Sequence, residues 1–304
     1  MTKTFKSLTM LGIASVFICA SALCGCKKEP GTITPPPEIP QIQYTTDDAL
    51  ISQFNANDER FAPENVTMRE NSPLKGKKIY WLGSSVTHGA SSEQDSMADY
   101  LAALTGCISV KEAVSGTTIF DDGSAGSKSY TKRLTDGTIF KKDEKIDAFI
   151  CQISTNDAWG DRAKYRGKMT DAYEIDINAF DKKTTLGGVE FIIAYAAETW
   201  GCPVYFYSGS WFGDEGPRNS GNPTGTAYGE LVRQVKEVVN KWSELGYDVG
   251  VIDLFNDESF NSHVSDEYYA WATSDAIHPK RTGYLQWWTP YFEQYLIVNL
   301  TMDK

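Results

Sequence analysis

Five short apolar runs, separated by stretches with helical periodicity, constrain the fold of this chain more than any other feature of its sequence. The runs cover residues 78–82, 107–114, 146–153, 203–208 and 249–254. Runs this apolar are typical of strands that are buried on both faces of a sheet. Their alternation with helices predicts an α/β protein, a three-layer α/β/α sandwich around a central, mostly parallel five-stranded sheet.

The helical stretches support the same architecture. The clearest covers residues 227–245, in which one apolar stripe recurs at steps of three and four, formed by Leu231, Val235, Val238, Trp242 and Leu245. Gly246 then provides a stop signal. Further helices are expected over residues 189–200 and about 282–298. In parallel sheets ligands bind beyond the carboxyl ends of the strands, so functional residues are expected directly after the strands.

The first residues of the chain are expected to be a targeting segment rather than part of the fold. Lys3 and Lys6 precede an apolar run over residues 8–23, which is too short to favour a transmembrane helix. The sequence Leu23-Cys24-Gly25-Cys26 that follows resembles a bacterial lipobox. This resemblance implies a signal peptide over residues 1–25 and lipidation of Cys26. A plain secretory signal and a retained membrane anchor are the alternatives.

The segment after the lipobox is expected to be a spacer. Residues 26–43 are rich in proline, which favours an extended tether. Residues 44–304 would then form the folded domain, exported and held at a membrane by its lipid. Lys27 follows the lipid-bearing Cys26, a pattern similar to outer-membrane sorting, with the protein facing the periplasm or the cell surface.

Charge and cysteine content exclude several classes of function. The formal net charge is −11, and an acidic protein repels the nucleic-acid backbone. The chain has no CxxC motif and no paired Cys/His spacing, so we expect neither a zinc site nor any other metal. No cofactor is expected. Cys107, Cys151 and Cys202 fall at or in predicted strands and are interpreted as buried free thiols.

The first two predicted strands end in segments suited to acyl-transfer chemistry. Gly83 and Gly89 flank Ser85, so a tight turn can expose this serine at the edge of the sheet. Its backbone N–H lies at the start of a predicted helix, which favours a developing negative charge. After the second strand, Gly116 has no Cβ, so a substrate can approach its N–H closely.

Two later segments supply the remaining groups. Asn156 follows the third strand and offers a side-chain amide as a further donor. Near the C-terminus, Asp275 precedes His278 by three residues, so its carboxylate can fold back onto the imidazole. Such a pair fixes the tautomer of a histidine that takes a proton from a serine.

These four segments, which we call the first to fourth blocks, lie in this order over residues 77–290 and resemble the SGNH (GDSL-like) hydrolase family. The resemblance implies a triad of Ser85, His278 and Asp275, with an oxyanion hole formed by Ser85, Gly116 and Asn156. Two positions depart from the family pattern: Ser84 stands where an Asp is usual, and Ser154 replaces the Gly of the third block.

Other residues are weaker candidates for substrate contact. His88 lies three residues after Ser85, where it can line or cap the site. Trp159 and Tyr165 lie in a polar insertion over residues 158–186, and Trp211 and Phe212 in a Gly-rich loop over 209–226. These aromatic residues either line a substrate groove or pack the loops down.

The sequence therefore predicts a secreted serine esterase that acts on a small ester or an acylated glycan, above all on acetyl groups of carbohydrates. A lysophospholipase or short-chain lipid esterase is one alternative. A non-catalytic surface lipoprotein that binds glycans on the same fold is another.

Overall fold

The computed structural model describes residues 56–171, 176–213, 224–262, 269 and 272–301. The chain divides into two units, residues 1–36 and 37–304, and all described residues belong to the second. The predicted signal peptide, Cys26 and the proline-rich tether lie outside the described residues.

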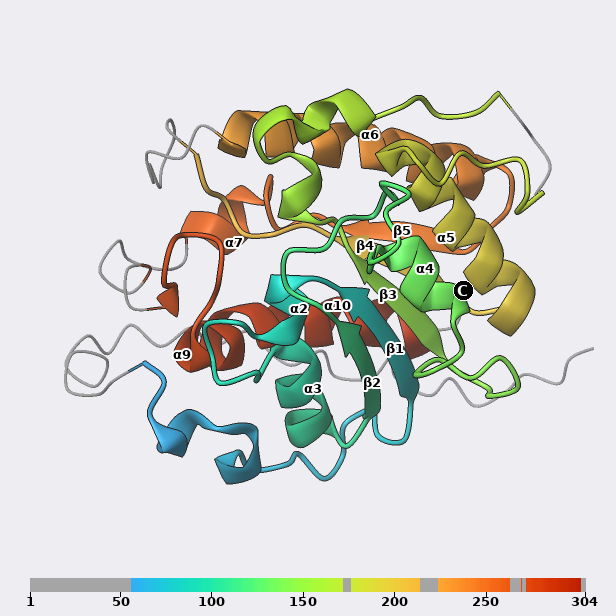
Figure 1. Ribbon diagram of the computed structural model, residues 1–304. Helices are drawn as coiled ribbons and strands as arrows, with labels where there is room; N and C mark the ends of the chain where they lie inside the picture. Colours follow the sequence, from blue (N-terminus) through green and yellow to red (C-terminus); the bar gives the residue numbers. More distant parts are fainter. Residues whose placement is uncertain (1–55, 172–175, 214–223, 263–268, 270–271, 302–304) are drawn as a thin grey trace, which may run out of the picture. The chain divides into compact units, whose positions relative to one another are not determined.

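Five parallel strands form the sheet, so the predicted fold class is confirmed (Figure 1). In sequence order they are β1 (Lys78–Gly83), β2 (Ile108–Ala113), β3 (Ala148–Gln152), β4 (Val204–Tyr207) and β5 (Val249–Ile252). Their order across the sheet is β2-β1-β3-β4-β5. β1, β3 and β4 are buried along almost their whole length, which explains their continuous apolar sequence.

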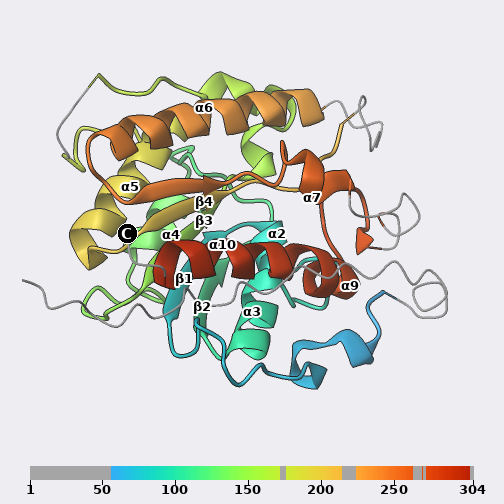
Figure 2. The same cartoon turned by 180° about the vertical axis from the view of Figure 1, so that it is seen from behind.

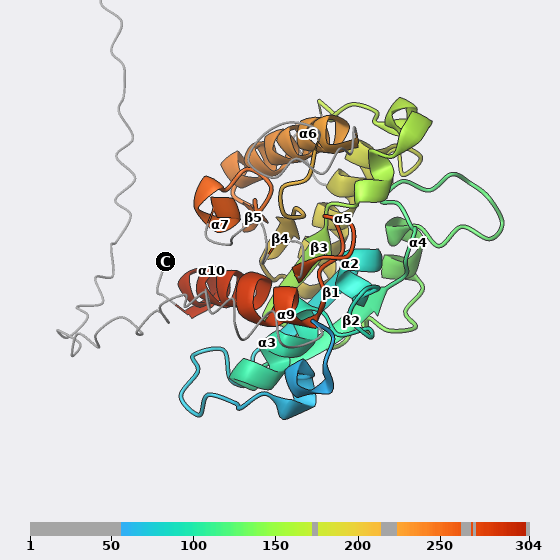
Figure 3. The same ribbon diagram turned by 90° about the vertical axis from the view of Figure 1, so that its left-hand side faces the viewer.

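Helices cover both faces of this sheet (Figure 3). One layer contains α3 (Met97–Thr105) and α10 (Thr289–Thr301), and α10 lies across the strands in the view of Figure 2. Its Phe292 packs on Trp81 of β1 and Tyr207 of β4. The other layer contains α4 (Tyr130–Thr135), α5 (Thr185–Trp200) and α6 (Thr224–Glu244). In that layer Trp200 of α5 stacks on Phe149 of β3. Side chains of successive strand residues point to opposite faces of the sheet, so each strand contributes to both layers.

The predicted helices are present with modest shifts. The expected helix over 227–245 is α6, and the expected helix over 189–200 begins earlier, where Thr184 caps α5 by accepting the N–H of Gly187. The last helix is divided into α9 (Arg281–Gly283), a π-helical turn η5 (Tyr284–Trp288) and α10. Pro290 has no N–H to continue an α-helical ladder, and the chain widens into the π turn directly before it.

Shorter elements complete the described chain. They are the 3₁₀ turns η1 (Glu59–Phe61), η2 (Pro63–Asn65), η3 (Thr155–Asp157) and η4 (Gly160–Tyr165), and the helices α2 (Ser85–His88) and α7 (Glu258–Ser262). No helix in the described ranges has both the length and the apolar character needed to cross a bilayer. Cys107, Cys151 and Cys202 are buried and unbridged, as predicted.

Candidate active site

A turn of minimal size joins β1 to α2 and carries Ser85. A Cβ on Gly83 would lie 1.6 Å from Oγ1 of Thr87, so only glycine fits where the strand ends. Gly89 closes α2 in the left-handed conformation, with φ of 80°. Ser85 is thereby fixed between two glycines and is 8% exposed.

The side chain of Gln152, the last residue of β3, accepts three hydrogen bonds from this turn. Its Oε1 accepts hydrogen bonds from the N–H of Ser84 at 2.9 Å, the N–H of Thr87 at 3.2 Å and Oγ1 of Thr87 at 2.8 Å. Sequence reasoning missed Gln152. The available signal was an amide at the end of an otherwise apolar strand.

The structure brings Ser85, His278 and Asp275 together in series. Nε2 of His278 lies 2.7 Å from Oγ of Ser85, and its Nδ1 lies 2.7 Å from Oδ2 of Asp275. Because the carboxylate can only accept, Nδ1 carries the proton and Nε2 is left to accept the serine hydroxyl. This is the tautomer that a general base requires.

The loop that carries Asp275 also shapes its charge. Oδ1 of Asp275 accepts the N–H groups of Ile277 at 3.0 Å and His278 at 2.8 Å. Burial acts to raise the pKa of this carboxyl, but the hydrogen bonds and charge of His278 outweigh it, and the pKa falls to about 2. Asp275 is therefore ionised at neutral pH and can stabilise an imidazolium. Ala276, which lies between Asp275 and Ile277 in the chain, has a φ of 66°, a backbone conformation that is strained for a residue with a Cβ.

Gly116 lies on an open surface after β2. Its φ is 78°, and an added Cβ would meet nothing within 4 Å. The conformation therefore requires glycine, while the space in front of it is free for a substrate. Its neighbour Thr117 presents its carbonyl oxygen to the third block, where it accepts from Oγ of Ser154 at 2.9 Å and Nδ2 of Asn156 at 3.1 Å.

The departure at Ser154 has a structural role. Its Oγ accepts from the backbone N–H of Asn156 at 3.2 Å and from Nδ2 at 3.2 Å. Both amide hydrogens of Asn156 are thus engaged, one with Thr117 and one with Ser154. A substrate oxygen held by this amide would replace one of the two acceptors. At the other departure, Ser84 is fully buried and its N–H donates to Gln152, so its side chain faces no substrate.

Asp157 is a buried cross-link beneath these loops. Its Oδ2 accepts the N–H of Ile119 at 2.9 Å, and its Oδ1 accepts Oγ1 of Thr185 at 2.9 Å. Burial raises the pKa of this carboxyl to about 6, although its hydrogen bonds act in the opposite direction. Asp157 therefore joins the second block to the start of α5 rather than facing the substrate.

His88 lies beside the triad, at a cavity of about 560 Å³. Ser115, next to Gly116, and Ser274, next to Asp275, line the same cavity, and Oγ of Ser274 donates to Oγ of Ser91 at 2.8 Å. The remaining lining residues are mostly polar: Asn57, Ala90, Glu93, Gln94 and Lys280. This polar cavity is therefore lined by chain neighbours of Gly116 and Asp275.

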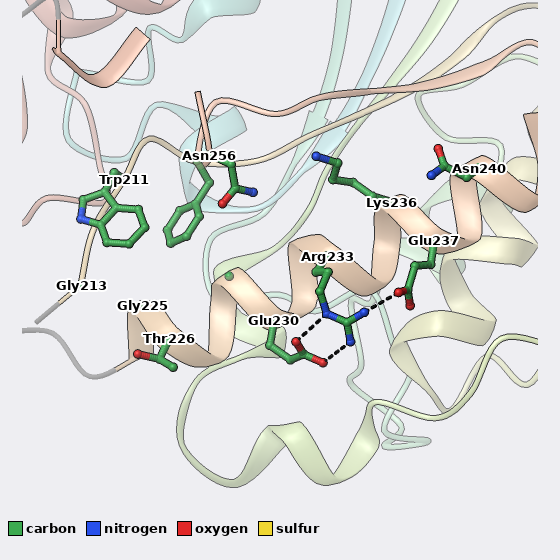
Figure 4. Close-up of a pocket in the computed structure, with 12 residues that line it drawn as sticks. Trp211, Gly213, Gly225, Thr226, Glu230, Arg233, Lys236, Glu237, Asn240 and Asn256 are labelled. Atoms are coloured by element: carbon green, nitrogen blue, oxygen red, sulfur yellow. Dashed lines mark hydrogen bonds and ion pairs between the residues drawn. The ribbon is translucent and has the colours of Figure 1, made fainter. Parts of the chain in front are cut away.

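Trp211 lines a second cavity, of about 660 Å³, at the carboxyl ends of β4 and β5 (Figure 4). Phe255 and Asn256 belong to the same wall, and α6 forms the opposite one. On α6, Arg233 is paired with both Glu230 and Glu237. The charges that line this cavity are thus largely neutralised by one another.

One hydroxyl links this second cavity to the triad. The hydroxyl oxygen of Tyr269 lies 2.8 Å from the carbonyl oxygen of Trp211 and 3.0 Å from that of Ala276. Ala276 lies between Asp275 and His278 in the chain. The side chain of Tyr269 therefore connects the backbone of the cavity wall to the loop that carries these two residues.

Of the two roles that the sequence left open for Phe212, the structure shows loop packing. Its side chain is fully buried, stacked on Tyr228 with ring centroids 5.3 Å apart and against Phe255 at 5.7 Å. Trp211 lines the cavity, whereas Phe212 lies in the hydrophobic core. Trp159 is 52% exposed, and Tyr165 stacks on Phe120.

Within the part of the chain that the structure describes, no three His, Cys, Asp or Glu side chains gather as they would around a metal ion. The site consists instead of hydrogen-bonded side chains and backbone donors at the carboxyl edge of the sheet. The parallel five-stranded sheet with helices on both faces is the α/β architecture that the sequence predicted.

A comparison with a solved structure supports the fold. A protein from Lactobacillus plantarum superposes with a TM-score of 0.51 and 20% identity, covering 73% of this chain and 97% of that one. A carbohydrate acetylesterase family member from Sinorhizobium meliloti gives a TM-score of 0.46 and 14% identity, covering 74% and 100%. An acetylxylan esterase from Geobacillus stearothermophilus gives 0.45 and 14%, covering 76% and 98%. No family model and no curated protein matches the sequence.

Proposed function

We propose that the protein is a carboxylic ester hydrolase with Ser85 as nucleophile, His278 as general base and Asp275 as the acid that orients it. The observation that carries this proposal is the series of two 2.7 Å contacts, from Oγ of Ser85 to His278 and from His278 to Asp275. A serine hydroxyl is a weak nucleophile until a neighbouring base accepts its proton.

The reaction proceeds by two acyl transfers. Oγ of Ser85 attacks the ester carbonyl carbon while its proton moves to Nε2 of His278. The tetrahedral intermediate collapses, and His278 gives the proton to the departing alkoxide, which leaves as an alcohol. Water then attacks the acyl-enzyme, with His278 accepting a water proton, and the second collapse releases the acid and restores the Ser85 hydroxyl.

We assign the oxyanion hole to the N–H groups of Ser85 and Gly116 and to Nδ2 of Asn156. The open space at Gly116 supports this assignment, and Nδ2 of Asn156 would give up its contact with Thr117 or Ser154 to bind the oxyanion. Oxyanion donors act because they are fixed before the charge develops.

The substrate is proposed to be an ester on a carbohydrate, above all an acetyl ester. The polar cavity beside His88 suits sugar hydroxyl groups rather than a long acyl chain. Trp211 adds an aromatic surface at the second cavity, whose lining also includes the amides of Asn256 and Asn240. Aromatic rings and amides on a surface without excess charge suit a neutral polyhydroxylated ligand.

The first test is hydrolysis of p-nitrophenyl acetate and butyrate by the purified protein and by its Ser85→Ala variant. We expect wild-type turnover that disappears in the variant. A folded wild-type protein without turnover on these esters or on acetylated glycans would contradict the esterase proposal and favour glycan binding alone. Release of acetate from acetylated oligosaccharides is expected to exceed hydrolysis of lysophospholipids, and the reverse preference would establish the lipid alternative.

Export and lipidation at Cys26 remain part of the proposal, supported by the lipobox resemblance. Labelled palmitate should be incorporated into the wild-type protein in a bacterial host and not into Cys26→Ser. Incorporation that persists in Cys26→Ser but stops in Cys24→Ser would show that Cys24 carries the lipid instead.

A further inference from the structure

Arg133 of α4 is a buried cation whose guanidinium contacts two segments of the candidate active site. It is 6% exposed. Its Nη2 donates to the carbonyl of Gly83 at 2.8 Å and to Oγ1 of Thr117 at 3.1 Å. Nη1 donates to the carbonyl and carboxylate of Glu112 at 3.1 and 3.0 Å, and Nε donates to the carbonyl of Lys128 at 2.9 Å. A guanidinium has five N–H donors, and these contacts use all five.

The positions of the acceptors are specific to the site. Gly83 ends β1 directly before the turn that carries Ser85, and Thr117 directly follows Gly116. One nitrogen of Arg133 therefore fixes the distance between the nucleophile turn and the second block. Its other contacts fix the guanidinium to β2 and to the chain that leads into α4.

Thr117 extends this clamp to the third block. Its Oγ1 donates to the carbonyl of Val114 at 2.6 Å, and its own carbonyl oxygen accepts from Ser154 and Asn156. The segments that carry Ser85, Gly116 and Asn156 thus meet in one hydrogen-bonded network, with Arg133 and Thr117 at its centre.

Burying a charged side chain costs free energy, because the charge loses its hydration. Only one of the five acceptors, the Glu112 carboxylate, is charged, and ion pairs of this kind often stabilise no more than apolar packing does. What the guanidinium adds is directional bonding to several groups at once, together with a positive charge behind the atoms that face a developing oxyanion.

We propose that Arg133 is the positioning residue of the oxyanion hole, which sets the N–H groups of Ser85 and Gly116 and the amide of Asn156 at their mutual distances. Arg133 acts through these residues and does not touch the substrate. The proposal rests on the esterase function proposed above, and it predicts an effect on kcat rather than on KM, because the hole is most complementary to the transition state.

The test compares Arg133→Ala, Arg133→Lys and the wild-type protein on p-nitrophenyl acetate. We expect Arg133→Ala to lose about 10- to 100-fold in kcat, the size of effect that a misplacement of about 1 Å produces, with KM changed less than about twofold. Millimolar guanidinium chloride should restore part of the kcat of Arg133→Ala and leave Ser85→Ala inactive. The ammonium group of the Arg133→Lys variant cannot form the same fork, so this variant should recover less kcat than the added guanidinium does.

Three further variants separate positioning from stability. Lys241→Ala removes a largely buried cation, paired at 2.9 Å with the fully buried Glu190 of α5, and should lower the melting temperature without lowering kcat. Thr117→Val removes the hydroxyl that Arg133 contacts and should lower kcat, whereas Thr117→Ser should retain it. The Thr117 pair keeps the proposal testable if Arg133→Ala fails to fold.

The outcomes distinguish the two proposals. Activity that survives Ser85→Ala would contradict the esterase mechanism itself. Activity that requires Ser85, but keeps its kcat in Arg133→Ala and Thr117→Val while only their stability falls, would overturn the positioning role and leave the esterase function intact.

Discussion

The two halves of the carboxyl edge of the sheet are built from different interactions. Over β1, β2 and β3, loops are joined by hydrogen bonds from buried polar side chains, among them Gln152 and Arg133. Over β4 and β5, hydrogen bonds of Ser208 and Asn261 are combined with aromatic contacts, and the rings of Phe212, Tyr228 and Phe255 pack together. Directional bonds fix atoms to fractions of an ångström, whereas rings supply surface. The first half is therefore suited to chemistry and the second to holding a substrate.

Asp275→Asn is expected to have the largest effect on the hydrogen-bonded half. An amide in this place can donate to Nδ1 of His278 and so favour the wrong tautomer, and kcat should fall on the order of 10³- to 10⁴-fold. Steady-state kinetics on p-nitrophenyl acetate measures the loss. A loss below about tenfold would show that the exposed Asp275 loop contributes little, and that the chemistry depends on Ser85 and His278 alone.

Asn156→Ala tests the oxyanion assignment on the same half. Removing one donor should lower kcat by about 10²- to 10³-fold with little change in KM. Asn156→Asp is the matched variant, since it keeps the size of the side chain and places a negative charge where the oxyanion forms. Undiminished turnover in Asn156→Ala would exclude the amide from the hole and leave the N–H groups of Ser85 and Gly116 to act without it.

The sequence predicted the strands and the triad because both have local signatures. Apolar runs place each strand within one or two residues, and an acid three residues before His278 is readable from spacing alone. Gln152 and Arg133 have no such signature. Arg133 lies in the ordinary polar stretch Tyr130–Thr135, and only the packing of α4 against the ends of β1 and β2 gives it five acceptors.

The aromatic half was harder to predict for a related reason. Trp211 and Phe212 are adjacent and chemically alike, so composition could not separate the one that faces the cavity from the one that enters the core. Their sides were decided by the path of the chain after β4.

Asp157→Asn tests how far the hydrogen-bonded half depends on pH. The pKa of Asp157 is raised from 3.8 to about 6 in the folded protein, so its contribution to stability is complete below about pH 4 and is lost as the pH rises through 6. The amide of the Asp157→Asn variant does not ionise, so the variant does not lose stability in this pH range. Between pH 4 and 7 the free energy of unfolding of the variant should therefore rise relative to wild type by roughly 2–3 kcal/mol. Denaturant titrations at both pH values measure the change, and parallel pH profiles would show that Asp157 does not titrate in this range.

Trp211→Ala addresses the aromatic half and is expected to have the smallest effect. Loss of a stacking surface of this kind costs about 0.5–1.5 kcal/mol, which corresponds to a KM for an acetylated oligosaccharide raised roughly 2- to 12-fold. Phe212→Leu is the matched control, because it changes the buried neighbour and should lower the melting temperature without raising KM. If Phe212→Leu raised KM and Trp211→Ala did not, the cavity would not be a sugar subsite, and the two halves would differ in how they are built but not in what they do.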